Sequence, residues 1–277
     1  MRTATAFAVA GFLAASASAQ DSATTCATGV HLIVARGSNE PAGVGRIGSV
    51  ANGVVAAIPG SQIEAISYPA TFDNYSTSVA TGTGAMKIAL TQYSSRCPDS
   101  KIALLGYSQG AHVVGDTLCG NTEDRDIDNM DFDFNVTTPV AASVVDHSVI
   151  AAILFGDPTH DTSASWNRGT STRDGLFPRE NVTACESYAP KIESYCDIGD
   201  IYCDLGNDTT VHGSYFSKYT INAVEFIVAQ FNSTKPSTNG TSPTTTPKPV
   251  PASGSALSAP AMLTSLVGLS VLVTHLL

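Results

Sequence analysis

Residues 101–118 read KIALLGYSQGAHVVGDTL, and this stretch decides the fold. Its first part, Lys101 to Leu105, is an apolar run that predicts a buried strand, and Ala111 to Leu118 predicts a helix. Between them lies Gly106-Tyr107-Ser108-Gln109-Gly110, a G-x-S-x-G pattern with a strand before it and a helix after it. In that context the pattern forms a tight turn that lifts the serine off the sheet, and side chains at the two glycine positions would collide with backbone. We therefore expect Ser108 to be a nucleophile.

Apolar strands alternate with helices along the rest of the chain. Further strands are predicted at Val30 to Ala35, Ile63 to Ile66 and Ile150 to Phe155, and helices at Ile47 to Ile58, Val79 to Tyr93 and Ser217 to Phe231. These strands are apolar throughout rather than on alternate residues, which is typical of a parallel sheet covered by helices on both faces. In such sheets the active site lies at the carboxyl ends of the strands.

A serine nucleophile needs a histidine base, and a carboxylate orients that base. In hydrolases with this turn the chain order is serine, then acid, then histidine. His212, in a loop before the last predicted helix and with acids upstream, fits best as the base. His160, after Gly156-Asp157-Pro158 at the carboxyl end of a strand, is the minor alternative. Chain order or position disfavours the other histidines, which are His31, His112, His147 and His275.

The acid is expected in Cys196-Asp197-Ile198-Gly199-Asp200-Ile201-Tyr202-Cys203. Two cysteines seven residues apart can pair in an oxidising compartment and close a small loop that holds a carboxylate in place. Asp197 and Asp200 both fit, and spacing alone does not choose between them.

The ends of the chain carry signals. Residues 1–19 have a charged start, a short apolar core and small residues ending at Ala19, which predicts a secretory signal peptide. Residues 233–258 are rich in Ser, Thr, Pro and Asn and predict an extended stalk. The apolar tail at 259–277, with small residues near Ser253 and Gly254, predicts a glycosylphosphatidylinositol (GPI) attachment signal, and a tail-anchor helix is the alternative.

Residues 20–232 remain for one catalytic domain. The balance of 24 acidic against 14 basic residues argues against nucleic acid or an anionic membrane as a partner. Six cysteines behind a secretion signal predict three disulfides rather than a metal site, and we expect a monomer without a cofactor. Glycosylation sequons, which fit secretion, occur at Asn74, Asn135, Asn181, Asn207, Asn232 and Asn239.

Taken together, GYSQG at 106–110, ARGSNE at 35–40, the Gly156-Asp157-Pro158 turn, and YCDIGDIYC at 195–203 followed by His212 resemble the fungal cutinase and acetylxylan esterase family. The resemblance covers residues 26–231. It implies a small α/β-hydrolase with a five-stranded parallel sheet covered by helices on both faces, and an exposed site without a large lid.

The same resemblance implies roles for individual residues. Ser108 is then the nucleophile, Asp200 the acid and His212 the base. The oxyanion hole is formed by the backbone amide of Gln109 and by the amide and hydroxyl of Ser38. The implied disulfides are Cys26–Cys97, Cys119–Cys185 and Cys196–Cys203.

The substrate is less well defined by the sequence. The loop at 201–211 is largely polar, and with the Cys119 and Cys185 pair it is closer to acetylxylan esterases, whereas residues 36–40 are closer to cutinases. We favour short-chain acyl esters such as acetylxylan, with plant cutin polyester as the alternative. A non-catalytic cell-wall or adhesive protein on the same scaffold is disfavoured, because all three catalytic positions hold the required residues. A peptidase is disfavoured because the resemblance lies within esterases.

Overall fold

The protein is described by a computed structural model covering residues 25–121, 125–126, 133–134, 136–180 and 182–235. Its centre is a six-stranded parallel sheet with the strand order β2-β1-β3-β6-β8-β7. These strands are β1 (Val30–Ala35), β2 (Gln62–Ala65), β3 (Lys101–Tyr107), β6 (Val149–Phe155), β7 (Asn167–Gly169) and β8 (Ile192–Cys196). A separate antiparallel pair comprises β4 (Arg125–Asp126) and β5 (Asp133–Phe134).

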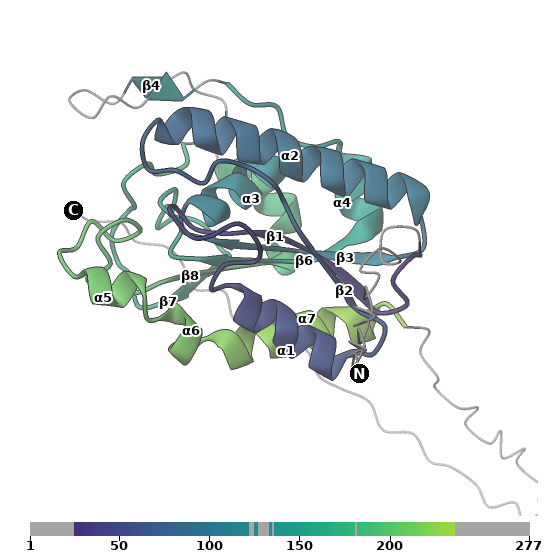
Figure 1. The fold of residues 1–277 in the computed structure, drawn as a ribbon. Coiled ribbons are helices and arrows are strands. Elements are labelled where there is room, and N and C mark those ends of the chain that lie inside the picture. The colour runs from purple at the N-terminus through teal and green to yellow at the C-terminus, as the bar shows by residue number, and fades with distance from the viewer. Residues whose placement is uncertain (1–24, 122–124, 127–132, 135, 181, 236–277) are drawn as a thin grey trace, which may run out of the picture. The chain divides into compact units, whose positions relative to one another are not determined.

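Helices cover both faces of the sheet, as Figure 1 shows. They are α1 (Gly48–Ala57), α2 (Tyr75–Arg96), α3 (Gln109–Cys119), α4 (Ala142–Ser148), the 3₁₀ helix η1 (Val182–Lys191), α5 (Thr209–His212), α6 (Tyr215–Lys218) and α7 (Thr220–Ser233). Successive residues of a strand point to opposite faces. In β1, Ile33 packs in the core under α2 and α3, whereas Leu32 and Val34 pack in the core under α1 and α7. Because both faces are buried, the strands are apolar at every position.

The sheet has six strands, so the expected count of five is corrected. Neither β7 nor β8 falls in a predicted strand range, and β7 is an edge strand that pairs with β8 through Asn167, Arg168 and Gly169. These residues are polar or small and are not buried, so β7 carries none of the apolar signal that marks a core strand. The helix expected over residues 217–231 is also divided, because α6 ends at Lys218 and α7 begins at Thr220.

Three disulfides tie the fold together: Cys26–Cys97, Cys119–Cys185 and Cys196–Cys203. These are the pairs that the resemblance implies, and such bonds form in oxidising compartments. The expected signal peptide, the GPI signal with Ser253 and Gly254, nearly all of the stalk, and the sequons at Asn135, Asn181 and Asn239 lie outside the described residues. Within the described ranges, no helix combines the length and apolar character needed to span a membrane.

A surface groove of about 330 Å³ lies between the ends of α1 and α7, and none of its lining residues belongs to the turn at Ser108. Thr28, two residues before β1, and Lys235, two residues after α7, both line it. The start of the sheet and the end of the last helix therefore lie together.

Candidate active site

Ser108 occupies the turn between β3 and α3, at the carboxyl edge of the sheet. Its backbone has φ 54°, a conformation that non-glycine residues seldom adopt and that is typical of strained functional turns. A Cβ at Gly106 would lie 2.3 Å from the carbonyl oxygen of Gly110, and one at Gly110 would lie 2.1 Å from that of Ala35. Both glycines are thus required by close backbone contacts. The amide of Ser108 donates to the carbonyl of Phe155, which fixes the turn against β6.

His212 lies at the end of α5 and lines the same pocket as Ser108. Its Nδ1 is 2.8 Å from Oδ2 of Asp200. An ionised carboxylate can only accept hydrogen bonds, so Nδ1 carries the hydrogen and Nε2 carries the free lone pair. Nε2 is buried and has no hydrogen-bond partner among the residues that the structure describes. Asp200 therefore holds the imidazole through Nδ1, and the basic nitrogen Nε2 is left to accept a proton.

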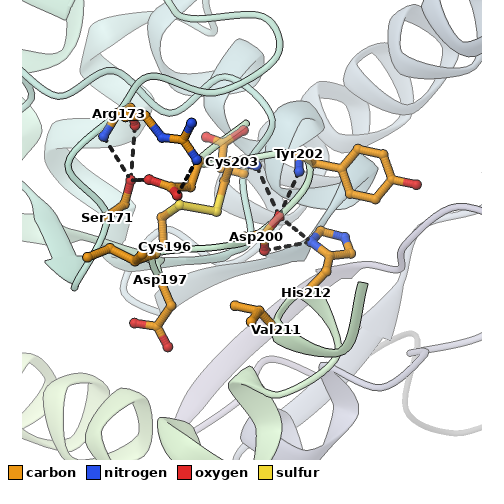
Figure 2. Close-up of a disulfide and its surroundings, with 12 residues drawn as sticks. Ser171, Arg173, Cys196, Asp197, Asp200, Tyr202, Cys203, Val211 and His212 are labelled. Atoms are coloured by element: carbon orange, nitrogen blue, oxygen red, sulfur yellow. Dashed lines mark hydrogen bonds and ion pairs between the residues drawn. A yellow bond between two sulfur atoms is a disulfide. The ribbon is translucent and has the colours of Figure 1, made fainter. Parts of the chain in front are cut away.

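Asp200 is fully buried in the loop that the Cys196–Cys203 disulfide closes, here called the acid loop (residues 196–203). Figure 2 shows that its carboxylate accepts hydrogen bonds from the backbone amides of Tyr202 (2.8 Å) and Cys203 (3.1 Å) and from the imidazole of His212. The hydroxyl of Tyr215 donates to Oδ2 at 2.6 Å. Burial by itself would raise the pKa of this carboxyl, but the hydrogen bonds from His212, Tyr215 and the Tyr202 amide outweigh burial and hold the pKa below its ordinary value.

Asp197, the other acid that fits the sequence, has a different environment. Its carboxylate accepts from Lys218 Nζ at 2.9 Å and from the Tyr219 hydroxyl at 2.8 Å, and it also binds Thr170. In Figure 2 it points away from His212. Asp197 therefore ties the acid loop to the start of the last helices, and the structure places Asp200 alone of the two beside the imidazole.

His160, the minor alternative for the base, is buried outside the pocket that Ser108 lines. It lines a separate small cavity of about 20 Å³ with Asp157 and Arg179. Burial lowers the pKa of its imidazole. The structure does not bring His160 together with Ser108 in one pocket.

Ser38 and Gln109, the residues expected at the oxyanion hole, lie close to Ser108. Gln109 is the first residue of α3, so its amide belongs to the positive end of a helix. The hydroxyl oxygen of Ser38 lines the pocket region, is buried and has no partner among the described residues. Two donors beside a serine nucleophile are what a developing oxyanion needs.

The side chain of Gln109 has a different role from its backbone N–H group. It is fully buried, accepts from the Ser78 hydroxyl at 2.8 Å and donates to the carbonyl of Thr71 at 2.9 Å. It thereby fixes the chain next to Phe72, which forms one wall of the pocket. The sequence motif contains Gln109 but gives no signal of this second role.

The loop that carries Ser38 is fixed by its own neighbours in the ARGSNE segment. The Glu40 carboxylate accepts from the amides of Gly37 (2.7 Å) and Arg46 (3.1 Å). The guanidinium of Arg36 donates to the carbonyl of Tyr68 at 2.8 Å. Ser38 is thus held by a network that exists before any substrate binds.

The pocket beside Ser108 has a volume of about 160 Å³. Its walls are mainly aromatic or apolar, and are formed by Phe72, Tyr75, Pro158, Leu176, Phe177 and Tyr202. The rings of Phe72 and Tyr202 come from two different loops and approach to 6.3 Å between centroids. Residues 201–211 are largely polar, but among them only Tyr202 lines the pocket as described. The polar residues of this loop therefore do not form its walls.

Comparison with known proteins agrees with this geometry. The family model described as cutinase matches residues 26–231. An acetylxylan esterase from Hypocrea jecorina is 35% identical over 227 residues, covering 79% of this chain and 73% of the relative. Cutinase 11 from Verticillium dahliae is 34% identical over 223 residues, covering 78% and 72%.

A solved structure of an acetylxylan esterase superposes with a TM-score of 0.67 at 36% identity, covering 75% of this chain and all of that one. The fold is that of a cutinase-like α/β-hydrolase, and the relatives are hydrolases of carboxylic esters. The chain therefore belongs to the cutinase family and is a carboxylic-ester hydrolase.

Proposed function

We propose that the enzyme cleaves esters through an acyl-enzyme on Ser108, with His212 as base and Asp200 as the residue that orients it. One observation carries this assignment. His212 is bound through Nδ1 by buried Asp200, its Nε2 has no hydrogen-bond partner among the described residues, and His212 lines the same pocket as Ser108.

In the proposed reaction Nε2 of His212 takes the proton of Ser108 Oγ as that oxygen attacks the ester carbonyl carbon. The negative charge that develops on the carbonyl oxygen is stabilised by the Gln109 amide and by the amide and hydroxyl of Ser38. The imidazolium then protonates the leaving alcohol, and the acyl group stays on Ser108. His212 then takes a proton from water as the water oxygen attacks the acyl carbon; the bond from that carbon to Ser108 Oγ breaks, His212 returns the proton to Oγ, and the carboxylic acid leaves.

The proposed substrates are short-chain acyl esters, such as acetyl groups on xylan. Pockets that hold drug-sized ligands span about 300–1,000 Å³, and this pocket of about 160 Å³ is smaller. The rings of Phe72 and Tyr202 narrow the space beside the nucleophile. A long acyl chain would leave most of its apolar surface in water, forgoing about 25 cal/mol for each Å² not buried. Sequence identity to the named acetylxylan esterase and cutinase is nearly equal, so the pocket is the better guide.

The test is hydrolysis of p-nitrophenyl esters from acetate to palmitate, together with acetylated xylan and cutin, by wild type and Ser108→Ala. We expect the acetate to be cleaved fastest and the variant to be inactive. Palmitate and cutin hydrolysis matching that of the acetyl substrates would favour the cutinase alternative. Full activity in the Ser108→Ala variant would contradict the nucleophile, and failure on every ester would contradict the proposed reaction.

We also propose that the enzyme is a monomer, is secreted after cleavage near residue 19, and is held at the cell surface by a stalk (233–258) and a GPI anchor. The three disulfides support export. Asn74, Asn207 and Asn232 are exposed, which suits glycosylation. Release of activity from cells by phosphatidylinositol-specific phospholipase C tests the anchor, and a mass shift with N-glycosidase tests the glycans. Retention of the activity after phospholipase, with release by detergent, would support a tail-anchor helix instead.

A further inference from the structure

Tyr215 contacts three parts of the acid loop through one hydroxyl group. The residue begins α6 and is fully buried. Its hydroxyl oxygen lies 2.6 Å from Oδ2 of Asp200, 3.1 Å from the backbone nitrogen of Asp197 and 3.2 Å from Sγ of Cys203. No motif in the sequence points to this residue.

The direction of these hydrogen bonds follows from their chemistry. The Asp197 amide has only a hydrogen to offer, so the phenol oxygen accepts it. The ionised carboxylate of Asp200 can only accept, so the single hydroxyl hydrogen of Tyr215 points to Oδ2. Burial and the charge of Asp200 both raise the pKa of the phenol, and Tyr215 therefore stays a donor throughout the pH range of an esterase assay.

The Tyr215 hydroxyl and the His212 imidazole share one oxygen atom, because Nδ1 of His212 is also 2.8 Å from Oδ2. We propose that Tyr215 is a positioning residue that holds the Asp200 carboxylate against His212 and sets the basicity of the imidazole. This inference rests on the proposed roles of Ser108, His212 and Asp200.

The physical link is the charge on Oδ2. A donated hydrogen bond stabilises that charge and weakens its attraction for an imidazolium. Without the phenol, Oδ2 binds the protonated imidazole more strongly, and the base is protonated up to a higher pH. The other titratable or charged side chains around the pair stay in place in such a variant, and they are Arg46, Tyr107, Asp197, Tyr202 and Asp204.

The matched control is Tyr219. Its hydroxyl donates to a carboxylate of the same loop, Oδ1 of Asp197, at 2.8 Å. Tyr219→Phe removes the same atom from a neighbouring phenol and leaves the Asp200 hydrogen bonds unchanged. Tyr219 is partly buried, and a structural effect of losing a phenol hydroxyl that is bound to the acid loop would be seen in both variants.

The experiment measures kcat/KM for p-nitrophenyl acetate from pH 4 to 9, because this ratio reports ionisation of the free enzyme. In Tyr215→Phe we expect the acid limb to move to higher pH by roughly 0.5–1 unit and the plateau to fall roughly tenfold. In Tyr219→Phe we expect the acid limb to stay where it is in wild type.

A second probe of the same hydrogen bond keeps the hydroxyl group at position 215 and changes only its acidity. Site-specific 2,3-difluorotyrosine at position 215 retains the shape and makes the phenol a stronger donor, so the acid limb should move to lower pH. An unshifted limb in the fluorinated protein, or equal shifts in the two phenylalanine variants, would overturn the inference. Ser108→Ala separates this result from the proposed function, since an inactive Ser108→Ala with an unshifted Tyr215 variant contradicts only the role of Tyr215.

Discussion

Replacing Gly156 by alanine should damage catalysis through His212. Gly156 follows β6 with φ 59°, and a Cβ there would lie 2.9 Å from both Cε1 and Nδ1 of the His212 ring. Ordinary van der Waals contact begins at 3.4 Å, so the ring has to move by the difference between 2.9 and 3.4 Å at the least. This is why glycine stands at the start of the Gly156-Asp157-Pro158 turn.

Two magnitudes follow for Gly156→Ala. An L-residue in the left-handed region is strained by about 1–2 kcal/mol, which lowers the free energy of unfolding. A misplacement of 1 Å can reduce a rate about 100-fold, and a shift of half that size at the base should reduce kcat about tenfold or more. KM for a small ester should change less, because the pocket walls stay in place.

The assay compares kcat and KM for p-nitrophenyl acetate with thermal unfolding of the same preparations. Gly84→Ala is the matched control, because Gly84 lies inside α2 and, apart from the adjoining backbone of that helix, no described atom lies within 4 Å of an added Cβ. It should raise stability by about 0.5–1 kcal/mol and leave kcat unchanged. A folded Gly156→Ala enzyme with kcat within twofold of wild type would refute the reasoning.

Three further predictions concern the acid loop. Asp200→Asn should reduce kcat by about 10⁴-fold, as loss of the orienting acid does in a serine triad. Asp197→Asn should mainly lower the unfolding temperature. Equal losses of kcat in the two variants would contradict the assignment of Asp200. Because folding lowers the pKa of Asp200, its stabilisation is present above the unfolded pKa near pH 4 and is lost as pH falls through the lower folded value. The unfolding temperature should therefore drop between pH 5 and 3, less steeply in Asp200→Asn, and parallel curves would count against this linkage. Replacing the Cys196–Cys203 disulfide by serines should lower the free energy of unfolding by about 2.5 kcal/mol, and replacing Cys26–Cys97 by about 4.5 kcal/mol, because the second bond closes a longer loop. Loss of Cys196–Cys203 should nevertheless reduce kcat more. Unfolding and activity measurements on both variants test these two points.

The core of the fold could be predicted because its physics is local. A strand buried on both faces is apolar at each position, and β1, β3 and β6 were recognisable for this reason. The edge strand β7 was missed because Asn167-Arg168-Gly169 owes its conformation to pairing with β8 and to no pattern of its own. The break between α6 and α7 was missed because the apolar spacing continues through Tyr219, whose hydroxyl is bound by Asp197.

The sequence predicts those residues of the candidate site that a tight turn requires, and it does not predict those that distant loops bring together. Ser108 is marked by glycines that close backbone contacts require. Spacing alone left Asp197 and Asp200 open, because both carboxylates lie in one small loop, and only the family resemblance pointed to Asp200, the one that faces His212. Of the aromatic walls, Tyr202 lies in the motif at 195–203, whereas Phe72 reaches the pocket from a loop that belongs to none of the motifs.

The groove shared by Thr28 and Lys235 also determines which way the enzyme faces when it is attached to something. Thr28 precedes β1, so the end of α7 lies at the amino edge of the parallel sheet, whereas Ser108 follows β3 at the opposite edge. Anything joined after Lys235, whether a fusion partner, a tag or an immobilisation linker, is attached at the edge of the sheet opposite Ser108. A bead joined to the protein after Lys235 would therefore leave the edge that carries Ser108 turned toward the medium.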